Sequence, residues 1–170
     1  MIRNSKLKTY LHWITFLLIA VTYASIELRG LFPKGGNMYA FIKQTHYNSG
    51  VLVCILMLVR LCFISQQKKA IRSNNPTIIK KFNGILLKVL YIIFLITPLT
   101  GIAIMLFGSK YWDLLYFKNI PFIYNNSDIK NTLKQTHELI ANSGYFAIFI
   151  HSCISMLLYL NYRKQKKHSG

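Results

Sequence analysis

The chain contains four long apolar stretches separated by shorter polar segments. They run near residues 11–28, 45–64, 85–107 and 139–160, and each carries few charges. The hydrocarbon core of a bilayer is about 30 Å thick, which roughly 20 residues of α-helix can cross. Backbone polar groups must be paired inside lipid, so such stretches cross it as helices. The pattern therefore predicts an all-α fold: a four-helix integral membrane bundle that forms one domain over residues 1–170.

Two polar regions refine this picture. The segment at residues 108–134 contains aromatic residues, Pro121 and the pair Asn125-Asn126, and we expect it to form an ordered outer cap with a short helix. The first apolar stretch follows Lys6 and Lys8, a pattern that signal peptides share. No small-x-small cleavage site follows it, so we expect this stretch to remain in the mature protein.

Composition and charge distribution favour a membrane protein over a nucleic-acid binder. Hydrophobic residues make up 53% of the chain and charged residues only 15%, which is too apolar for an ordinary soluble domain. The net charge of +17 by itself is typical of nucleic-acid binding. The basic residues, however, lie mainly in short runs between the apolar stretches, as in loops that flank membrane spans. We therefore expect contact with membrane lipid and none with nucleic acid.

Lysine and arginine are divided unequally between the two predicted membrane faces, and this predicts the orientation. One face has twelve: Arg3, Lys6, Lys8, Lys68, Lys69, Arg72, Lys80, Lys81, Arg163, Lys164, Lys166 and Lys167. The other has seven: Arg29, Lys34, Lys43, Lys110, Lys118, Lys130 and Lys134. Cytoplasmic loops are enriched in these residues, so both termini are predicted to be cytoplasmic. The expected location is a bacterial inner membrane.

Three cysteines, Cys54, Cys62 and Cys153, lie within the apolar stretches. Their odd number and the lack of a CxxC motif indicate neither a disulfide framework nor a zinc site. We interpret all three as small core residues.

Four of the five histidines lie at the ends of apolar stretches or inside one, where polar groups usually mark a function. His137 and His151 are 14 residues apart, which places them on nearly the same helix face. Along the axis they are separated by about 21 Å. If the helices run alternately up and down, His12 reaches the level of His151 and His46 that of His137. The fifth histidine, His168, lies in the polar tail.

Paired histidines from facing helices can hold haem iron inside a bundle. The sequence thus predicts two haem b groups, one between His12 and His151 on the cytoplasmic side and one between His46 and His137 on the outer side. A zinc site would need about four clustered ligands, which two separate pairs do not provide. The remaining alternative is that these histidines only form hydrogen bonds between helices.

Three further residues are candidates for cofactor binding. Gly50 and Gly144 follow His46 and His137 by four and seven residues, on or near the same helix faces. Glycines there would make room for a flat macrocycle or, equally, allow close helix packing. Arg60 is 14 residues after His46, near the inner haem level, where it would pair with a propionate or extend to the interface. For Lys88, extension to the interface is the favoured interpretation.

At these residues the chain resembles the prokaryotic cytochrome b561 family over nearly its whole length. The matching segments are Leu11-His12-Trp13, Glu27-Leu28-Arg29-Gly30-Leu31-Phe32-Pro33, His46 with Gly50 and Arg60, Pro98 with Gly101, and His137-Glu138 with Gly144 and His151. The resemblance implies a four-helix membrane bundle with two b haems. It also implies that His12, His46, His137 and His151 are axial ligands and that electrons are exchanged with ubiquinone.

Within that family, the chain is similar to short, free-standing members that oxidise superoxide to oxygen and pass the electron to ubiquinone. Such members often carry extra histidines near the start of the third helix, and residues 82–88 have none. Any quinone contact of that region is therefore not carried over. Seven basic residues minus four acids leave +3 on the outer face, which would permit steering of an anion without demonstrating it.

Two other functions remain open at the level of sequence. The chain would serve as a cytochrome b relay subunit between quinol and a partner dehydrogenase or periplasmic redox protein. Alternatively, it would be a membrane protein without a cofactor, whose histidines only pack. The sequence does not predict whether the chain is a monomer or an oligomer.

Overall fold

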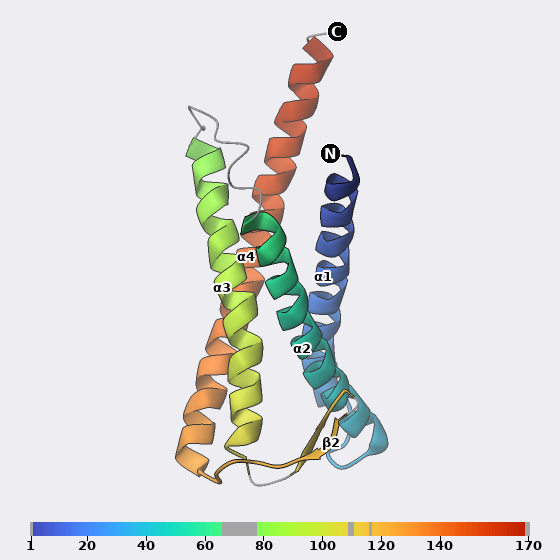
Figure 1. Ribbon diagram of the computed structural model, residues 1–170, viewed down its shortest axis with the longest axis vertical. Coiled ribbons are helices and arrows are strands. Elements are labelled where there is room, and N and C mark those ends of the chain that lie inside the picture. The colour runs from blue at the N-terminus through green and yellow to red at the C-terminus, as the bar shows by residue number, and fades with distance from the viewer. Residues whose placement is uncertain (1, 66–77, 109–110, 116, 169–170) are drawn as a thin grey trace.

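Four long helices dominate the computed structural model, which describes residues 2–65, 78–108, 111–115 and 117–168 (Figure 1). They are α1 (Ile2–Leu28), α2 (Asn37–Ser65), α3 (Ile78–Leu106) and α4 (Ser127–His168). Each is long and apolar enough to cross a membrane, so the predicted four-helix membrane fold is confirmed. The helices extend beyond the apolar stretches that predicted them, because the flanking polar residues continue the same backbone hydrogen bonding.

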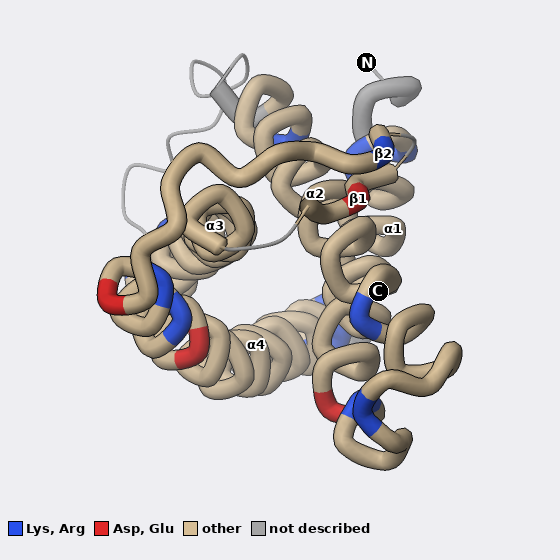
Figure 2. The backbone as a smooth tube through the Cα atoms, turned by 90° about the horizontal axis from the view of Figure 1, so that it is seen from below, with Lys and Arg blue, Asp and Glu red and all other residues tan. Residues whose placement is uncertain are grey.

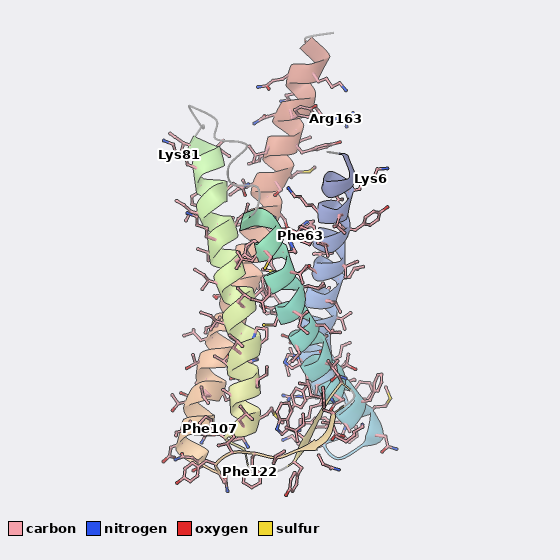
Figure 3. All side chains as sticks on the ribbon, viewed as in Figure 1. Lys6, Phe63, Lys81, Phe107, Phe122 and Arg163 are labelled. Carbon is pink, nitrogen blue, oxygen red and sulfur yellow. The ribbon has the colours of Figure 1, made fainter. Side chains whose placement is uncertain are left out.

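The helices alternate in direction, so both termini lie at one end of the bundle (Figure 1). Figure 3 places Lys6, Lys81 and Arg163 at or toward that end and Phe107 and Phe122 at the other. Both termini therefore lie on one side of the bundle, as expected. That this side is cytoplasmic stays a prediction from the positive-inside count. Of the basic residues in that count, Lys68, Lys69, Arg72 and Lys110 lie outside the described residues.

Helix α1 packs mainly against α2, and α3 packs against α4. The buried core joins these two helix pairs at Val53, Met57, Leu86, Leu90, Ile93, Phe94 and Ala147. Much of the outward surface is also apolar: Phe146 and Phe149 on α4 are 72% and 69% exposed. Water-soluble proteins rarely expose such continuous apolar surface. The outside of the bundle therefore suits contact with lipid tails.

The cysteines show why an apolar neighbourhood does not predict burial in such a bundle. Cys54 is buried, but Cys62 and Cys153 are exposed. The interpretation of all three as core residues was therefore wrong for two of them. In lipid, the outward face of a helix is as apolar as the inward face, so sequence composition does not separate the two.

The cap between α3 and α4 contains a β-hairpin, and the expectation of a short helix there was wrong. Strand β1 (Trp112–Leu114) pairs antiparallel with β2 (Phe117–Ile120). The Asp113 carboxylate accepts a hydrogen bond from the Asn119 backbone N–H at 2.9 Å and lies 3.4 Å from Lys118 Nζ. These contacts, led by the Asn119 N–H, hold the pKa of Asp113 below its ordinary value. Local hydrogen bonds of this kind favour a turn over a helix.

Two short segments complete the end of the bundle that carries the hairpin. A 3-10 turn, η1 (Arg29–Leu31), follows α1 directly. Figure 2 shows this end of the bundle. The segment that links α3 to α4 extends across it to the ends of α1 and α2, where the hairpin lies. The hairpin thus covers the end of the bundle at which His46 and His137 lie.

Gly144 of α4 lies where the Tyr23 side chain reaches across from α1. A Cβ atom added there would overlap the Tyr23 hydroxyl. That hydroxyl donates a hydrogen bond to the Ala141 carbonyl at 2.7 Å, and the Tyr23 ring lies 4.4 Å from the Tyr145 ring, centre to centre. Gly144 therefore leaves room for the Tyr23 side chain, and its predicted place beside a macrocycle stays a prediction.

We expect Gly144→Ala to lower the stability of the bundle by about 1–3 kcal/mol, because the new methyl group displaces the Tyr23 hydroxyl. Tyr23→Phe, which removes that hydroxyl, should cost about 1 kcal/mol alone but should relieve the defect of Gly144→Ala when the two are combined. Thermal unfolding in detergent measures both effects. Gly84→Ala in α3 is the matched control, since nothing lies within 4 Å of its added Cβ. Additive losses in the double variant would contradict this account.

Candidate functional site

A cavity of about 440 Å³ lies between the helices near the hairpin end. Every helix contributes to its lining, with Tyr23 from α1, His46 from α2, Thr97 from α3 and His137 from α4. Trp112 and Leu114 of the hairpin line it as well. Sites for small molecules and cofactors commonly measure about 300–1,000 Å³. The cavity therefore has the size of a ligand site and is surrounded by all parts of the bundle.

His46 and His137 meet in this cavity, as their positions in the sequence predicted. Their ring centres are 6.3 Å apart and their planes are inclined by 82°. Imidazole nitrogens bind metals at about 2 Å, so two imidazoles on opposite sides of one ion have ring centres about 6 Å apart. The observed separation thus suits two axial ligands of one metal.

The Nδ1 atoms of both histidines are held by backbone carbonyls. His46 Nδ1 lies 2.9 Å from the Thr22 oxygen, and His137 Nδ1 lies 3.0 Å from the Thr97 oxygen. A carbonyl only accepts hydrogen bonds, so each Nδ1 donates its proton. The lone pair of each Nε2 is then free for a metal. Metal-binding histidines usually have this arrangement, in which the second nitrogen fixes the ring orientation.

The two anchors have equivalent places in the fold. Thr22 lies on α1, the packing partner of α2, and Thr97 lies on α3, the packing partner of α4. Thr100 adds a hydroxyl oxygen 3.1 Å from His137 Nδ1. The sequence analysis missed these threonines. A backbone carbonyl occurs at every position, so only the Thr100 hydroxyl offered a signal, and many threonines in membrane helices bond only to their own helix.

Glycine at two positions gives space to the same site. A Cβ at Gly101 would lie 3.2 Å from His137 Cε1, so glycine leaves room for the imidazole ring. Gly101 entered the sequence analysis only through the family resemblance. Gly50 lines the cavity, and its Cβ would lie 3.9 Å from Thr22 Cγ2, an ordinary contact distance. Gly144 does not belong to the cavity lining.

The other two histidines lie in a second cluster at the end of the bundle that holds both termini. Arg60 Nη2 is 3.4 Å from His12 Nδ1, and its guanidinium lies 5.6 Å from the centre of the Tyr91 ring. His12, His151 and Arg60 lie close enough together for their charges to interact. Arg60 thus contacts groups of the bundle, whereas Lys88 is exposed, as its expected extension to the interface requires.

The members of this inner cluster differ in their burial. His12 is exposed, and His151 is half-buried. His151 Nδ1 is inaccessible and has no hydrogen-bond partner among the described residues. The structure therefore groups His12, His151 and Arg60, but among the described residues no carbonyl holds His151 Nδ1 as carbonyls hold the outer pair.

Charged residues of both signs surround the outer cavity. Arg29 and Lys134 line it, but so do Glu27 and Glu138. Lys134 Nζ lies 3.8 Å from Glu138, and Glu27 accepts a hydrogen bond from the Tyr145 hydroxyl at 2.9 Å. The Arg29 guanidinium lies 5.7 Å from the centre of the Tyr39 ring. The two positive and two negative charges of the lining therefore nearly cancel. Arg29 differs from Lys134 in lying over an aromatic ring.

The sequence matches the family model of prokaryotic cytochrome b561 over residues 5–169. The chain belongs to the prokaryotic cytochrome b561 family. This is a family of membrane electron-transfer proteins that bind haem b. The outer cavity of this cytochrome b561 protein fits that cofactor, because it combines two facing imidazoles, two free Nε2 atoms and glycines that leave space.

Two curated relatives match this cytochrome b561 protein over most of its length. "Cytochrome b561 homolog 1" of Escherichia coli (strain K12) is 43% identical over 157 residues, which cover 88% of this chain and 86% of the relative. "Probable superoxide oxidase CybB" of Yersinia pestis is 29% identical over 163 residues, covering 91% of this chain and 88% of the relative.

We expect Gly101→Val to lower the amount of haem b bound per chain, because the added methyl groups displace the His137 ring. The measurement is haem content per protein after purification, with thermal unfolding as a check of the fold. Gly84→Val places the same change in the same helix, where the added Cβ meets nothing within 4 Å, and should retain full haem content. Equal haem contents in the two variants would show that His137 does not need this space.

Proposed function

We propose that this chain is a di-haem b membrane oxidoreductase. One haem would be held by His46 and His137 at the hairpin end, and the other by His12 and His151 at the end with the termini. The observation that carries the proposal is the facing pair His46 and His137, whose ring centres are 6.3 Å apart and whose Nδ1 atoms are both anchored. Bound haem supplies reversible one-electron chemistry.

The residues around the two proposed haems orient the histidine ligands and supply charge near them. The Thr22 and Thr97 carbonyls fix the outer imidazoles and make their Nε2 atoms better ligands. Gly50 and Gly101 leave space beside them, and Gly144 leaves room for the Tyr23 side chain of α1. Arg60 places a positive charge beside His12, where it would pair with a haem propionate. In this proposal the bundle binds and orients the two haems.

We further propose that the electron donor is superoxide and the acceptor is ubiquinone. Two superoxide anions would each lose one electron and leave as oxygen, and ubiquinone would take up the two electrons and two protons to form ubiquinol. The name of the relative from Yersinia pestis supports this substrate. The hairpin end would face the periplasm of a bacterial inner membrane, with Arg29 in the lining to attract the anion.

One observation favours the alternative of a relay subunit. Glu27 and Glu138 offset Arg29 and Lys134 in the cavity lining, so the cavity has no excess of positive charge to attract an anion. A relay would pass electrons between quinol and a partner dehydrogenase or periplasmic redox protein, for which a neutral cavity suffices. Superoxide consumption by the purified protein separates the two functions.

We expect each histidine pair to account for one haem. His46→Ala and His137→Ala should remove the same spectral component from the dithionite-reduced absorption spectrum, because either change leaves one axial ligand. His12→Ala and His151→Ala should remove the other component. His168→Ala, in the polar tail, is the control and should keep both. Retention of full haem content in any of the first four variants would exclude that residue as a required ligand.

We expect purified protein with ubiquinone to consume superoxide faster than spontaneous dismutation in stopped-flow measurements. Arg29→Gln should lower the second-order rate constant by about two- to fivefold at low ionic strength and less at high salt, because it removes a cation from the cavity lining. Lys34→Gln is the control: it removes a charge from an exposed residue of the same loop outside the lining. No acceleration by the wild-type protein would reject superoxide as the substrate.

A further inference from the structure

The hairpin is attached to α2 on both sides of His46 along the chain. Gln44 Nε2 donates hydrogen bonds to the Asp113 carbonyl at 2.8 Å and to Asn48 Oδ1 at 3.1 Å. Asn48 Oδ1 also accepts a hydrogen bond from the Leu115 backbone N–H at 2.9 Å. Asp113 lies between Trp112 and Leu114, the two hairpin residues that line the cavity, and Leu115 directly follows them. These hydrogen bonds hold the hairpin in place over the outer cavity.

Trp112, the first residue of β1, is held between this attachment and the cavity. It is 8% exposed and lines the cavity together with His46 and His137. Its Nε1 atom is inaccessible to solvent and has no hydrogen-bond partner among the described residues. An indole N–H is a donor only, and buried donors in native proteins are nearly always paired. The described residues thus leave the indole N–H without an acceptor, on a side chain that lines the cavity.

We propose that the Trp112 indole N–H is a binding group of the outer cavity that donates a hydrogen bond to an anionic oxygen of the bound molecule. Arg29 lines the same cavity and can pair with such an oxygen, whereas Lys134 lies 3.8 Å from Glu138. The inference rests on the proposed function, in which this cavity holds haem b. The oxygen belongs either to a haem propionate or to an anionic substrate, and the chemistry is the same in both cases.

Trp112→Phe tests this directly, because it keeps an aromatic ring and removes the N–H. The holoprotein is mixed with an excess of a haem acceptor, and the rate of haem loss from the outer site is followed. The same measurement is made on protein reconstituted with haem b dimethyl ester, in which both carboxylates are neutral. Trp13→Phe is the matched control, since the Trp13 side chain is 57% exposed and lies on α1 outside the cavity lining.

If the indole N–H binds a haem propionate, we expect Trp112→Phe to speed the loss of haem b by roughly tenfold. Loss of the dimethyl ester should be accelerated much less. If the indole N–H instead binds the substrate anion, the rate of haem loss should be unchanged. The rate constant for superoxide consumption should then fall in Trp112→Phe but not in Trp13→Phe. Either result supports the donor role. Equal acceleration with both haems would assign Trp112 to packing only, and no change in any rate would also overturn the proposal.

A second measurement tests the proposal without changing Trp112, in case Trp112→Phe does not fold. In the Trp13→Phe background Trp112 is the single tryptophan, and its indole N–H gives one signal in the ¹⁵N spectrum of the reduced protein. The proton should exchange with solvent more slowly with haem b than with the dimethyl ester, and equal exchange would contradict a bond to the propionate. A wild-type protein without haem would instead reject the proposed function itself, independently of Trp112.

Discussion

Two hydrogen bonds, from His46 to the Thr22 carbonyl and from His137 to the Thr97 carbonyl, define the outer site. An imidazole inside an apolar bundle must satisfy its N–H group, and few partners exist there other than backbone. Each bond therefore meets a solvation requirement and aims the opposite nitrogen into the cavity. The distance between the rings and the space at Gly101 have a function only when both rings are held in this way.

The architecture supplies one such bond from each helix pair. Helix α1 anchors the histidine of α2, and α3 anchors the histidine of α4, so each pair presents one oriented imidazole to the space between them. The inner cluster is built differently, since Arg60 rather than a carbonyl contacts His12. The two histidine pairs thus have distinct surroundings, which would allow the two haems of the proposed function to differ in their properties.

The hairpin adds a polar cover to an apolar site. Its own turn is closed by Asp113 and Asn119, and its attachment to α2 uses the side-chain amides of Gln44 and Asn48. These bonds lie at the end of the bundle, so they do not need to be buried in lipid. Through them, Trp112 is held over the cavity by a segment that is far from His46 in sequence but fastened close to it in space.

The four helices and the grouping of the histidines follow from the sequence alone, because helical spacing and membrane thickness leave few other arrangements. The 14-residue spacing of His137 and His151 sufficed to predict two levels of histidine pairs. The carbonyls that anchor the rings, the hairpin in the cap, the contact of Gly144 with Tyr23 and the outward positions of Cys62 and Cys153 became known only from the folded chain. These features depend on contacts between helices, and inside lipid the two faces of an apolar helix look alike in sequence.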